Sequence, residues 1–298
     1  MAISMFDYKG IEALYHIIEL QSFSSAAKHL DITQSAVSQR LKSLQEQYGD
    51  PLLLKTQPYA PTDVGSALLA HYRKVAVLEQ DTSKVLNDDS TPLHLTISLS
   101  KDMLDTWFLE ILGQHDILSQ VQLELISDNQ AFSMQHFKSG KASCCFTTTS
   151  TTIANCTATF VGYMNYIMVA SPDYVKKYFK KQVPSKEELL TAPALAYDVD
   201  DALHEDYLSK FFGLNDCMPN YHMVPSAQAF CQLVKQGSVY ALVPEAYILD
   251  DVKNGDIVSL FPDKIWKLPI YLHHWSFGHR VYNHSISQLI SYAKEVLE

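Results

Sequence analysis

Residues 23–44 read FSSAAKHLDITQSAVSQRLKSL, and this run decides the fold of the N-terminal part of the chain. Ser22 stands just before it, and Thr33 divides it into two helical stretches. Because Ser and Thr side chains accept hydrogen bonds from the free N–H groups of a helix N-terminus, the run predicts two helices joined by a tight turn. Small residues stand where these helices would cross: Ala26, Ala27 and Ala36. Close crossing of two short helices is typical of a helix-turn-helix.

The flanking sequence completes this N-terminal block. Apolar residues at helical spacing predict an earlier amphipathic helix, namely Ile11, Leu14, Ile17 and Ile18. Gly49 can end the last helix of the motif in a left-handed conformation. The segments 50–56 and 58–61 then predict a short hairpin, or wing. We therefore expect residues 1–61 to form an all-α winged helix-turn-helix domain.

The second helix of the motif carries polar side chains on the face that its apolar residues leave outside. In a helix-turn-helix this helix enters the major groove of DNA. Gln and Arg can form two-point hydrogen bonds with base edges, whereas Ser suits phosphates. The residues expected to contact double-stranded promoter DNA are Ser24, Thr33, Gln34, Ser35, Ser38, Arg40, Lys42 and Lys55. A three-helix packing unit with a polar outer face is the alternative interpretation.

Charge alone does not support DNA binding. The chain of 298 residues has a formal net charge of −10, and residues 1–80 carry seven Lys or Arg against eight Asp or Glu. Apolar runs stay well below the roughly 18 residues that span a bilayer, and the N-terminal stretch lacks the pattern of a secretory signal. These features predict a cytoplasmic protein that does not enter a membrane. Five scattered cysteines predict neither a disulfide framework nor a metal site.

Residues 62–90 predict one long helix, capped by Thr62. Its apolar residues form a narrow stripe of the coiled-coil type at Val64, Leu68, Tyr72, Val75 and Leu78. A helix with so narrow a stripe needs a partner. That partner is either its own domain or a second copy of the helix.

The remaining sequence, residues 91–298, alternates strand-like and helix-like patterns, which favours an α/β domain with mainly parallel sheets. The strand-like runs are residues 93–99, 121–126, 142–147, 158–170, 194–197, 221–224, 239–243 and 270–275. Gly140 and Gly237 stand where helices would end.

Open α/β sheets bind ligands beyond the carboxyl ends of their strands. Helix starts near Ser98, Ser100 and Ser226 could hold a carboxylate, and Thr147 and Thr149 could add hydroxyl groups. Acceptors for a cationic group are Asp128, Asp198 and Asp201. Ordinary helix caps and a solvated acidic loop are the alternative interpretations.

Sequence patterns of catalysis are missing. We find no phosphate loop, dinucleotide fingerprint, zinc-protease motif or nucleophile elbow. His273 and His274 are adjacent on a predicted strand, so they point to opposite faces and cannot chelate together. The chain is therefore predicted to be neither an enzyme nor a cofactor-dependent protein.

Four segments resemble the LysR-type transcriptional regulators: residues 23–30, 33–44, 48–53 and 61–65. Within that family, Ser38-Gln39-Arg40 and the proline-rich wing are most similar to the ArgP/LysG branch, which regulates the export of basic amino acids. The resemblance extends more loosely downstream, with Thr106-Trp107, Ala170-Ser171-Pro172, Gln228-Ala229-Phe230 and Gln236-Gly237.

This resemblance implies a C-terminal effector domain of the periplasmic-binding-protein type with two subdomains. The first would comprise about 91–165 and 268–298, and the second about 166–267. It also implies a linker helix that pairs in a homodimer or homotetramer, a nucleoid location, lysine or arginine as effector, and RNA polymerase as a further partner. A metabolite-binding protein without a regulatory role and an α/β enzyme are the competing hypotheses.

Overall fold

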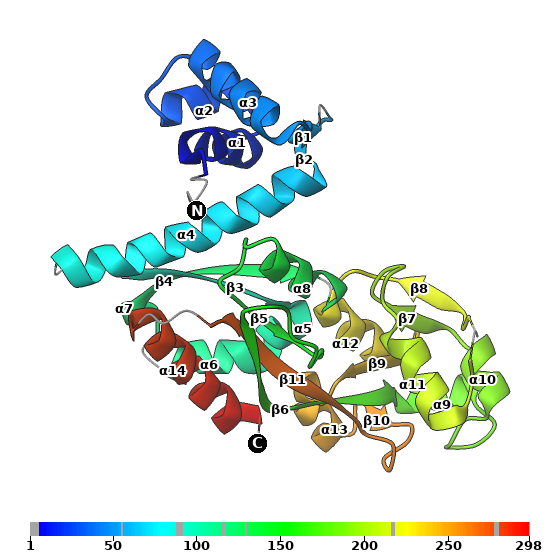
Figure 1. The fold of residues 1–298 in the computed structure, drawn as a ribbon. Coiled ribbons are helices and arrows are strands. Elements are labelled where there is room, and N and C mark those ends of the chain that lie inside the picture. The colour runs from blue at the N-terminus through cyan, green and yellow to red at the C-terminus, as the bar shows by residue number, and fades with distance from the viewer. Residues whose placement is uncertain are drawn as a thin grey trace.

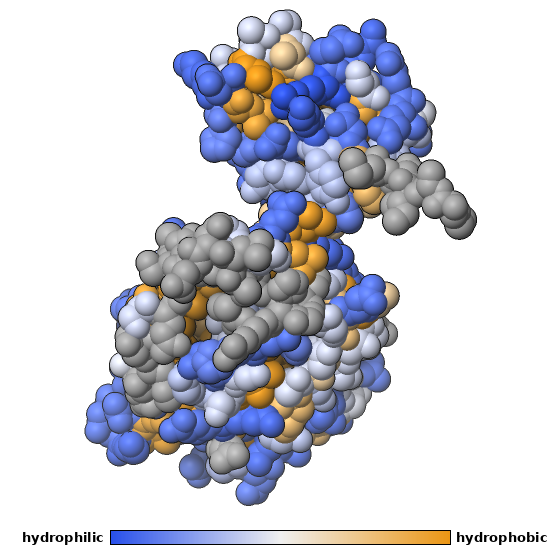
Figure 2. Space-filling view, turned by 60° about the vertical axis from the view of Figure 1, so that its left-hand side comes forward, coloured by the Kyte–Doolittle hydropathy of each residue, from blue (hydrophilic) through white to orange (hydrophobic). Residues whose placement is uncertain are grey.

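The computed structural model describes residues 6–54, 56–87, 92–114, 117–128, 130–215, 218–276 and 280–297. A small helical head stands above a larger α/β domain, and one long helix crosses between them (Figure 1). In the space-filling view, the head joins the larger domain through a narrow neck (Figure 2). Among these residues, no helix is both long and apolar enough to cross a membrane.

The head contains three helices, α1 (Tyr8–Leu20), α2 (Phe23–His29) and α3 (Gln34–Tyr48), and a wing of β1 (Leu53–Leu54) paired antiparallel with β2 (Ala60–Pro61). Both predicted caps are present. Ser22 Oγ accepts a hydrogen bond from the Ser25 N–H at 3.2 Å, and Thr33 Oγ1 accepts one from the Ala36 N–H at 3.2 Å. Gly49 ends α3 with a φ of 72°. The winged helix-turn-helix prediction is therefore confirmed.

Helix α4 (Asp63–Asn87) starts as predicted, because Thr62 Oγ1 accepts a hydrogen bond from the Gly65 N–H at 3.1 Å. The first half of the apolar stripe is already covered by residues of the same chain. Leu68 is 5% exposed within the core of the head, and Val64 and Tyr72 pack against the same core. The interpretation of the stripe as one continuous dimer seam is wrong for its first half, because α1 already packs against it. Val75 and Leu78 are half-buried.

The large domain is built on one mixed sheet with strand order β10-β6-β11-β5-β3-β4, in which β9 also pairs with β6. The strands are β3 (Leu93–Ser100), β4 (Val121–Asp128), β5 (Cys144–Thr147), β6 (Cys156–Ala170), β9 (Ala241–Pro244), β10 (Val258–Ser259) and β11 (Trp266–Trp275). A separate pair joins β7 (Ala194–Ala196) and β8 (Tyr221–Met223). All eight predicted strands are present within a few residues, and the two-residue β10 was missed.

The expectation of mainly parallel sheets is wrong. Strand β3 pairs parallel with β4 and β5, and β7 pairs parallel with β8. Strand β11, however, is antiparallel to both β5 and β6, and β6 is antiparallel to β9 and β10. The chain runs along β6 and returns along β11 beside it, and neighbouring strands that run in opposite directions must pair antiparallel.

Helices cover this sheet and join its strands. They are α5 (Lys101–Met103), the π-helix η1 (Leu104–Phe108), α6 (Leu109–Gln114), α7 (Ile117–Gln120), α8 (Gln130–Lys138), α9 (Pro172–Tyr178), α10 (Lys186–Thr191), α11 (Leu203–Phe212), α12 (Ala227–Lys235), the 3-10 helix η2 (Glu245–Tyr247), α13 (Leu249–Asn254) and α14 (Arg280–Leu297). Gly140 and Gly237 follow α8 and α12 with φ values of 72°, which confirms both predicted helix ends.

Candidate nucleic-acid interface and effector cleft

The outer face of α3 is the candidate DNA interface. Val37, Leu41 and Leu44 are buried against α1 and α2, which turns the polar side of the helix outward. Six of the predicted contact residues are exposed: Ser24, Thr33, Gln34, Ser35, Ser38 and Lys42. Two of them also organise the helix start, because the hydroxyl groups of Thr33 and Ser35 lie 2.9 Å apart in a hydrogen bond. This geometry suits a helix that enters a groove.

The Arg40 side chain is less exposed than the sequence pattern indicates, and it forms an ion pair within the head. Its Nη1 atom lies 3.8 Å from Glu12 Oε2 of α1, and its side chain is 28% exposed. An ion pair so close to solvent contributes little to stability, but it holds the guanidinium near α1. Lys55 lies outside the described residues.

A cleft opens in the large domain beyond the carboxyl ends of β3 and β4. The space between its walls is about 680 Å³, a volume that includes open solvent. Separated segments of the chain supply its lining: Ser100, Lys101, Asp102, Asp128, Tyr166, Leu195, Tyr197, Asp201, Leu203, His204, Phe230, Leu242, Val243 and Pro244. Such a site can enclose a metabolite with one charged end and an apolar stem.

Three of the eight predicted effector residues line this cleft, namely Ser100, Asp128 and Asp201. The other five do not belong to the lining. Ser98 is fully buried, and Thr147 Oγ1 accepts a hydrogen bond from the Thr149 N–H. Asp198 Oδ1 accepts one from the Asp200 N–H. Ser226 Oγ accepts one from the Ala229 N–H and so caps α12.

Asp102 is the cleft residue that the sequence analysis missed as a ligand. Its Oδ2 atom accepts a hydrogen bond of 2.8 Å from the hydroxyl group of Tyr166, in the second half of β6. Burial raises the pKa of the Asp102 carboxyl to about 6, since the Tyr166 hydrogen bond offsets only part of the burial and the nearby Asp201 raises it further. The position of Ser100-Lys101-Asp102 at the end of a strand could have indicated Asp102 as a ligand residue, but the sequence analysis named only Ser100 from this run.

The charges of the cleft are mainly negative. Asp102, Asp128 and Asp201 face one lysine, Lys101, whose Nζ atom pairs with Asp105 at 3.4 Å. Burial also raises the pKa of Asp201, although its carboxylate accepts hydrogen bonds from the backbone N–H groups of Tyr197 and Leu203. The buried His204 adds no charge at neutral pH, because burial lowers its pKa to about 4. The arrangement is suited to a ligand that carries positive charge.

A winged helix-turn-helix head, a long linker helix and a cleft lined by charged and apolar side chains define a ligand-responsive regulator of transcription. Residues 8–66 match the family described as "Bacterial regulatory helix-turn-helix protein, lysR family", and residues 90–280 match "LysR substrate binding domain". The chain belongs to the LysR family of transcriptional regulators, as the sequence motifs predicted, and is not an enzyme.

Relatives named HTH-type transcriptional regulator ArgP are similar over the whole length. The chain is 33% identical to that of Vibrio parahaemolyticus serotype O3:K6 and 36% identical to that of Vibrio cholerae serotype O1 (strain ATCC 39541), in both cases over 98% of each chain.

Solved structures share the fold. ArgP from Mycobacterium tuberculosis superposes with a TM-score of 0.84 at 26% identity, over 99% of both chains. LysG from Corynebacterium glutamicum with bound effector arginine gives a TM-score of 0.77 at 24% identity, over 98% of this chain and 100% of that one.

Proposed function

We propose that this LysR-type regulator responds to a basic amino acid, lysine or arginine, in the cytoplasm. Residues 1–61 bind promoter DNA at the nucleoid, residues 62–90 link and pair the subunits, and residues 91–298 bind the effector in the subdomains described above. The observation that carries the choice of effector is the set of three cleft carboxylates. The arginine bound to the related LysG supports the same choice.

The proposed ligand orientation follows from the charges. The distal cation lies at Asp102 and Asp128, because these carboxylates line the cleft and Asp201 is occupied by backbone N–H groups. The ligand carboxylate faces the helix start at Ser100, where N–H groups and the helix dipole favour an anion, because Ser226 caps α12 outside the lining. Thr147 and Thr149 lie outside the lining, so a backbone carbonyl is the better partner for the α-amino group.

Calorimetry of the full chain with matched ligands tests the effector. Arginine is compared with citrulline, and lysine with norleucine, because each neutral partner keeps the shape and removes the distal charge. We expect binding of one or both basic amino acids and at least tenfold weaker binding of the neutral analogues. Equal binding of the neutral analogues would exclude recognition by the carboxylates. Genome-wide DNA capture with and without the ligand then identifies the promoters and tests the regulatory role, including any action through RNA polymerase.

The proposal includes assembly into a homodimer or homotetramer through the second half of α4. Val75 and Leu78 are half-buried and lie beyond the part of α4 that the head core covers. A Val75→Asp, Leu78→Asp double variant places two charges in this seam, where removal of water is costly. Sedimentation should show a smaller assembly. Ala76→Asp adds a charge at an exposed position of the same turn and should leave the assembly intact. An unchanged assembly in the double variant would mean that the subunits pair elsewhere.

A further inference from the structure

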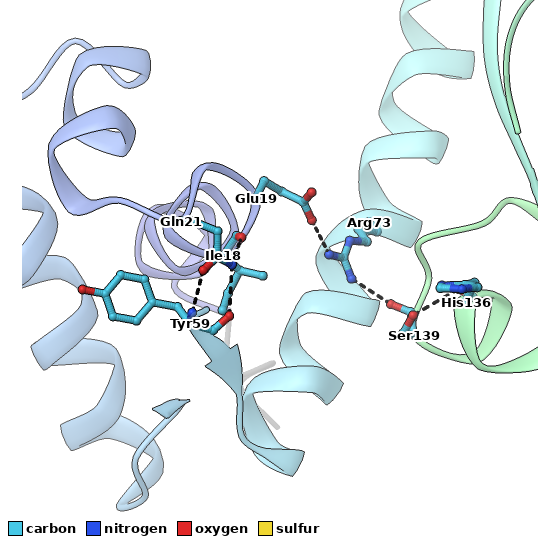
Figure 3. A network of polar contacts seen from close by, with 7 residues as sticks. All are labelled: Ile18, Glu19, Gln21, Tyr59, Arg73, His136 and Ser139. Carbon is cyan, nitrogen blue, oxygen red and sulfur yellow. Dashed lines mark hydrogen bonds and ion pairs between the residues drawn. The ribbon is translucent and has the colours of Figure 1, made fainter. Parts of the chain in front are cut away.

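Arg73 of α4 connects the head to the effector domain. Its Nη2 atom donates a hydrogen bond of 2.6 Å to Glu19 Oε1 of α1, and its Nη1 atom donates one of 3.0 Å to the backbone carbonyl of Ser139 (Figure 3). The Arg73 side chain is only 11% exposed. Charge-assisted hydrogen bonds from a planar guanidinium fix the directions of both partners. One side chain therefore connects the end of α1 with the turn after α8.

The C-terminal end of α8 docks closely on α4 at this point. Gly140 has a φ of +72°, and a Cβ atom placed there would lie 3.1 Å from the Ala70 carbonyl oxygen and 3.2 Å from the Ala70 Cα atom. Lys74 adds a second contact, because its Nζ atom lies 3.8 Å from the centre of the Trp275 ring, which stacks on Phe137 of α8. The partners of Arg73 and Lys74 thus converge on the same end of α8.

The same helix is connected to the effector cleft. Asp128, which lines the cleft, has its Oδ2 atom 3.4 Å from His136 Nε2 of α8. The backbone carbonyl of His136 accepts a hydrogen bond of 3.1 Å from Ser139 Oγ and another of 3.1 Å from the Ala142 N–H. Figure 3 shows His136 hydrogen-bonded to Ser139, whose carbonyl Arg73 holds. Because His136 also contacts Asp128, it connects the cleft carboxylate with this turn.

We propose that α8 couples the cleft to the head, with Arg73 as the joint between them. A cationic ligand at Asp128 competes with His136 for the same carboxylate. Loss of the Asp128–His136 contact changes the position of His136 and of the 139–140 turn, and through Arg73 the orientation of α1 and the recognition helix. If the ligand binds one of these two arrangements more tightly, it shifts the population toward that arrangement. The resulting change in DNA affinity is limited by the difference between the ligand's affinities for the two arrangements. The ligand part of this inference rests on the proposed effector class.

The test measures the affinity of the full chain for its promoter DNA with and without arginine. In an Arg73→Gln variant we expect arginine to bind within about twofold of its wild-type affinity, while the change that arginine causes in DNA affinity falls to nearly nothing. His136→Ala should also lose the change in DNA affinity that arginine causes, although the hydrogen bond between Arg73 and Glu19 remains. Lys138→Gln removes a positive charge from an exposed position at the same end of α8 and should keep the full response. A full response in Arg73→Gln would overturn the inference.

Hydrogen exchange separates this inference from the proposed effector. In the absence of any ligand, Arg73→Gln should speed amide exchange in the 136–140 turn and in the last turn of α1 together, and Lys138→Gln should not. If the wild-type protein ignores lysine and arginine, the effector proposal fails. If exchange in the two segments is unchanged or uncoupled in Arg73→Gln, the joint itself is excluded.

Discussion

The head and the effector cleft place their functional side chains in opposite ways. In the head, six of the candidate DNA-binding side chains are exposed, most of them on the outside of α3, above a separate layer of buried apolar residues. In the cleft, the polar groups come from segments far apart in the sequence, and Asp102 and Tyr166 are held inside the domain. Folding and binding therefore depend on different residues in the head, whereas in the cleft the same buried groups affect both stability and binding.

The largest expected effect is on stability, and it tests whether the head and the effector domain unfold independently. Leu44 is fully buried in the head core, so Leu44→Ala should lower the free energy of unfolding of the head by about 2–5 kcal/mol. The effector domain has its own apolar core and should unfold at an unchanged temperature. Calorimetric scans would show one shifted and one constant transition, with the exposed Gln47→Ala as control. A common shift of both transitions would show that the domains unfold as one unit.

A smaller effect concerns the pH dependence of the cleft. Burial raises the pKa of Asp102 from 3.8 to about 6, so the folded domain keeps a proton that the unfolded chain releases. The resulting loss of stability develops as the pH rises from about 4 to about 6 and is fully present above that. Replacement of Asp102 by Asn removes it and should stabilise the ligand-free effector domain at pH 7.5 by up to about 3 kcal/mol, with little change at pH 4.

Denaturant titrations at both pH values measure this difference, and the same Asp102→Asn variant should weaken arginine binding. Asp173→Asn, at an exposed position of α9, is the matched control. If Asp102→Asn stabilised the domain equally at pH 4 and at pH 7.5, the charge of the Asp102 carboxylate would not be the cause.

The smallest expected effect tests whether DNA binding and the stability of the head depend on different residues. Gln34→Ala and Arg40→Ala should each weaken specific DNA binding by about 1–3 kcal/mol if the side chain contacts a base. Neither should change the unfolding of the head by more than about 0.5 kcal/mol, since Gln34 is exposed and Arg40 forms only a surface ion pair. Gel-shift titrations at several salt concentrations measure the binding, and the near-neutral head predicts a modest salt dependence. A folded Gln34→Ala protein with unchanged operator affinity would remove this residue from the interface.

The head could be predicted well because its signals are local. Caps such as Ser22 and Thr33 act on N–H groups three residues away, and the spacing of Val37, Leu41 and Leu44 fixes both the helix and its buried face. The long helix shows the limit of such patterns. Its stripe correctly indicated coverage, but periodicity does not show what covers it, and Leu68 packs on the head of its own chain.

The cleft could be predicted only in part. Ser100 and Asp128 were predicted because they stand at the carboxyl ends of two strands, which meet at one edge of the sheet. The partner of Asp102 lies 64 residues away in β6, and no local pattern connects the two. The direction of strand pairing was missed for the same reason, because it depends on which segments meet after the chain has crossed the sheet.

The position of Arg73 has a practical consequence for chimeric regulators. Its two partners belong to different domains, Glu19 to the head and Ser139 to the effector domain. A hybrid that joins this head to a foreign sensor at the start of α4 would keep Glu19 and lose Arg73. A join after Arg73 would keep the arginine but lose the Ser139 carbonyl that accepts its hydrogen bond. Modular exchange in biosensor design would therefore need to carry Glu19, Arg73 and the 136–140 turn as one inherited unit.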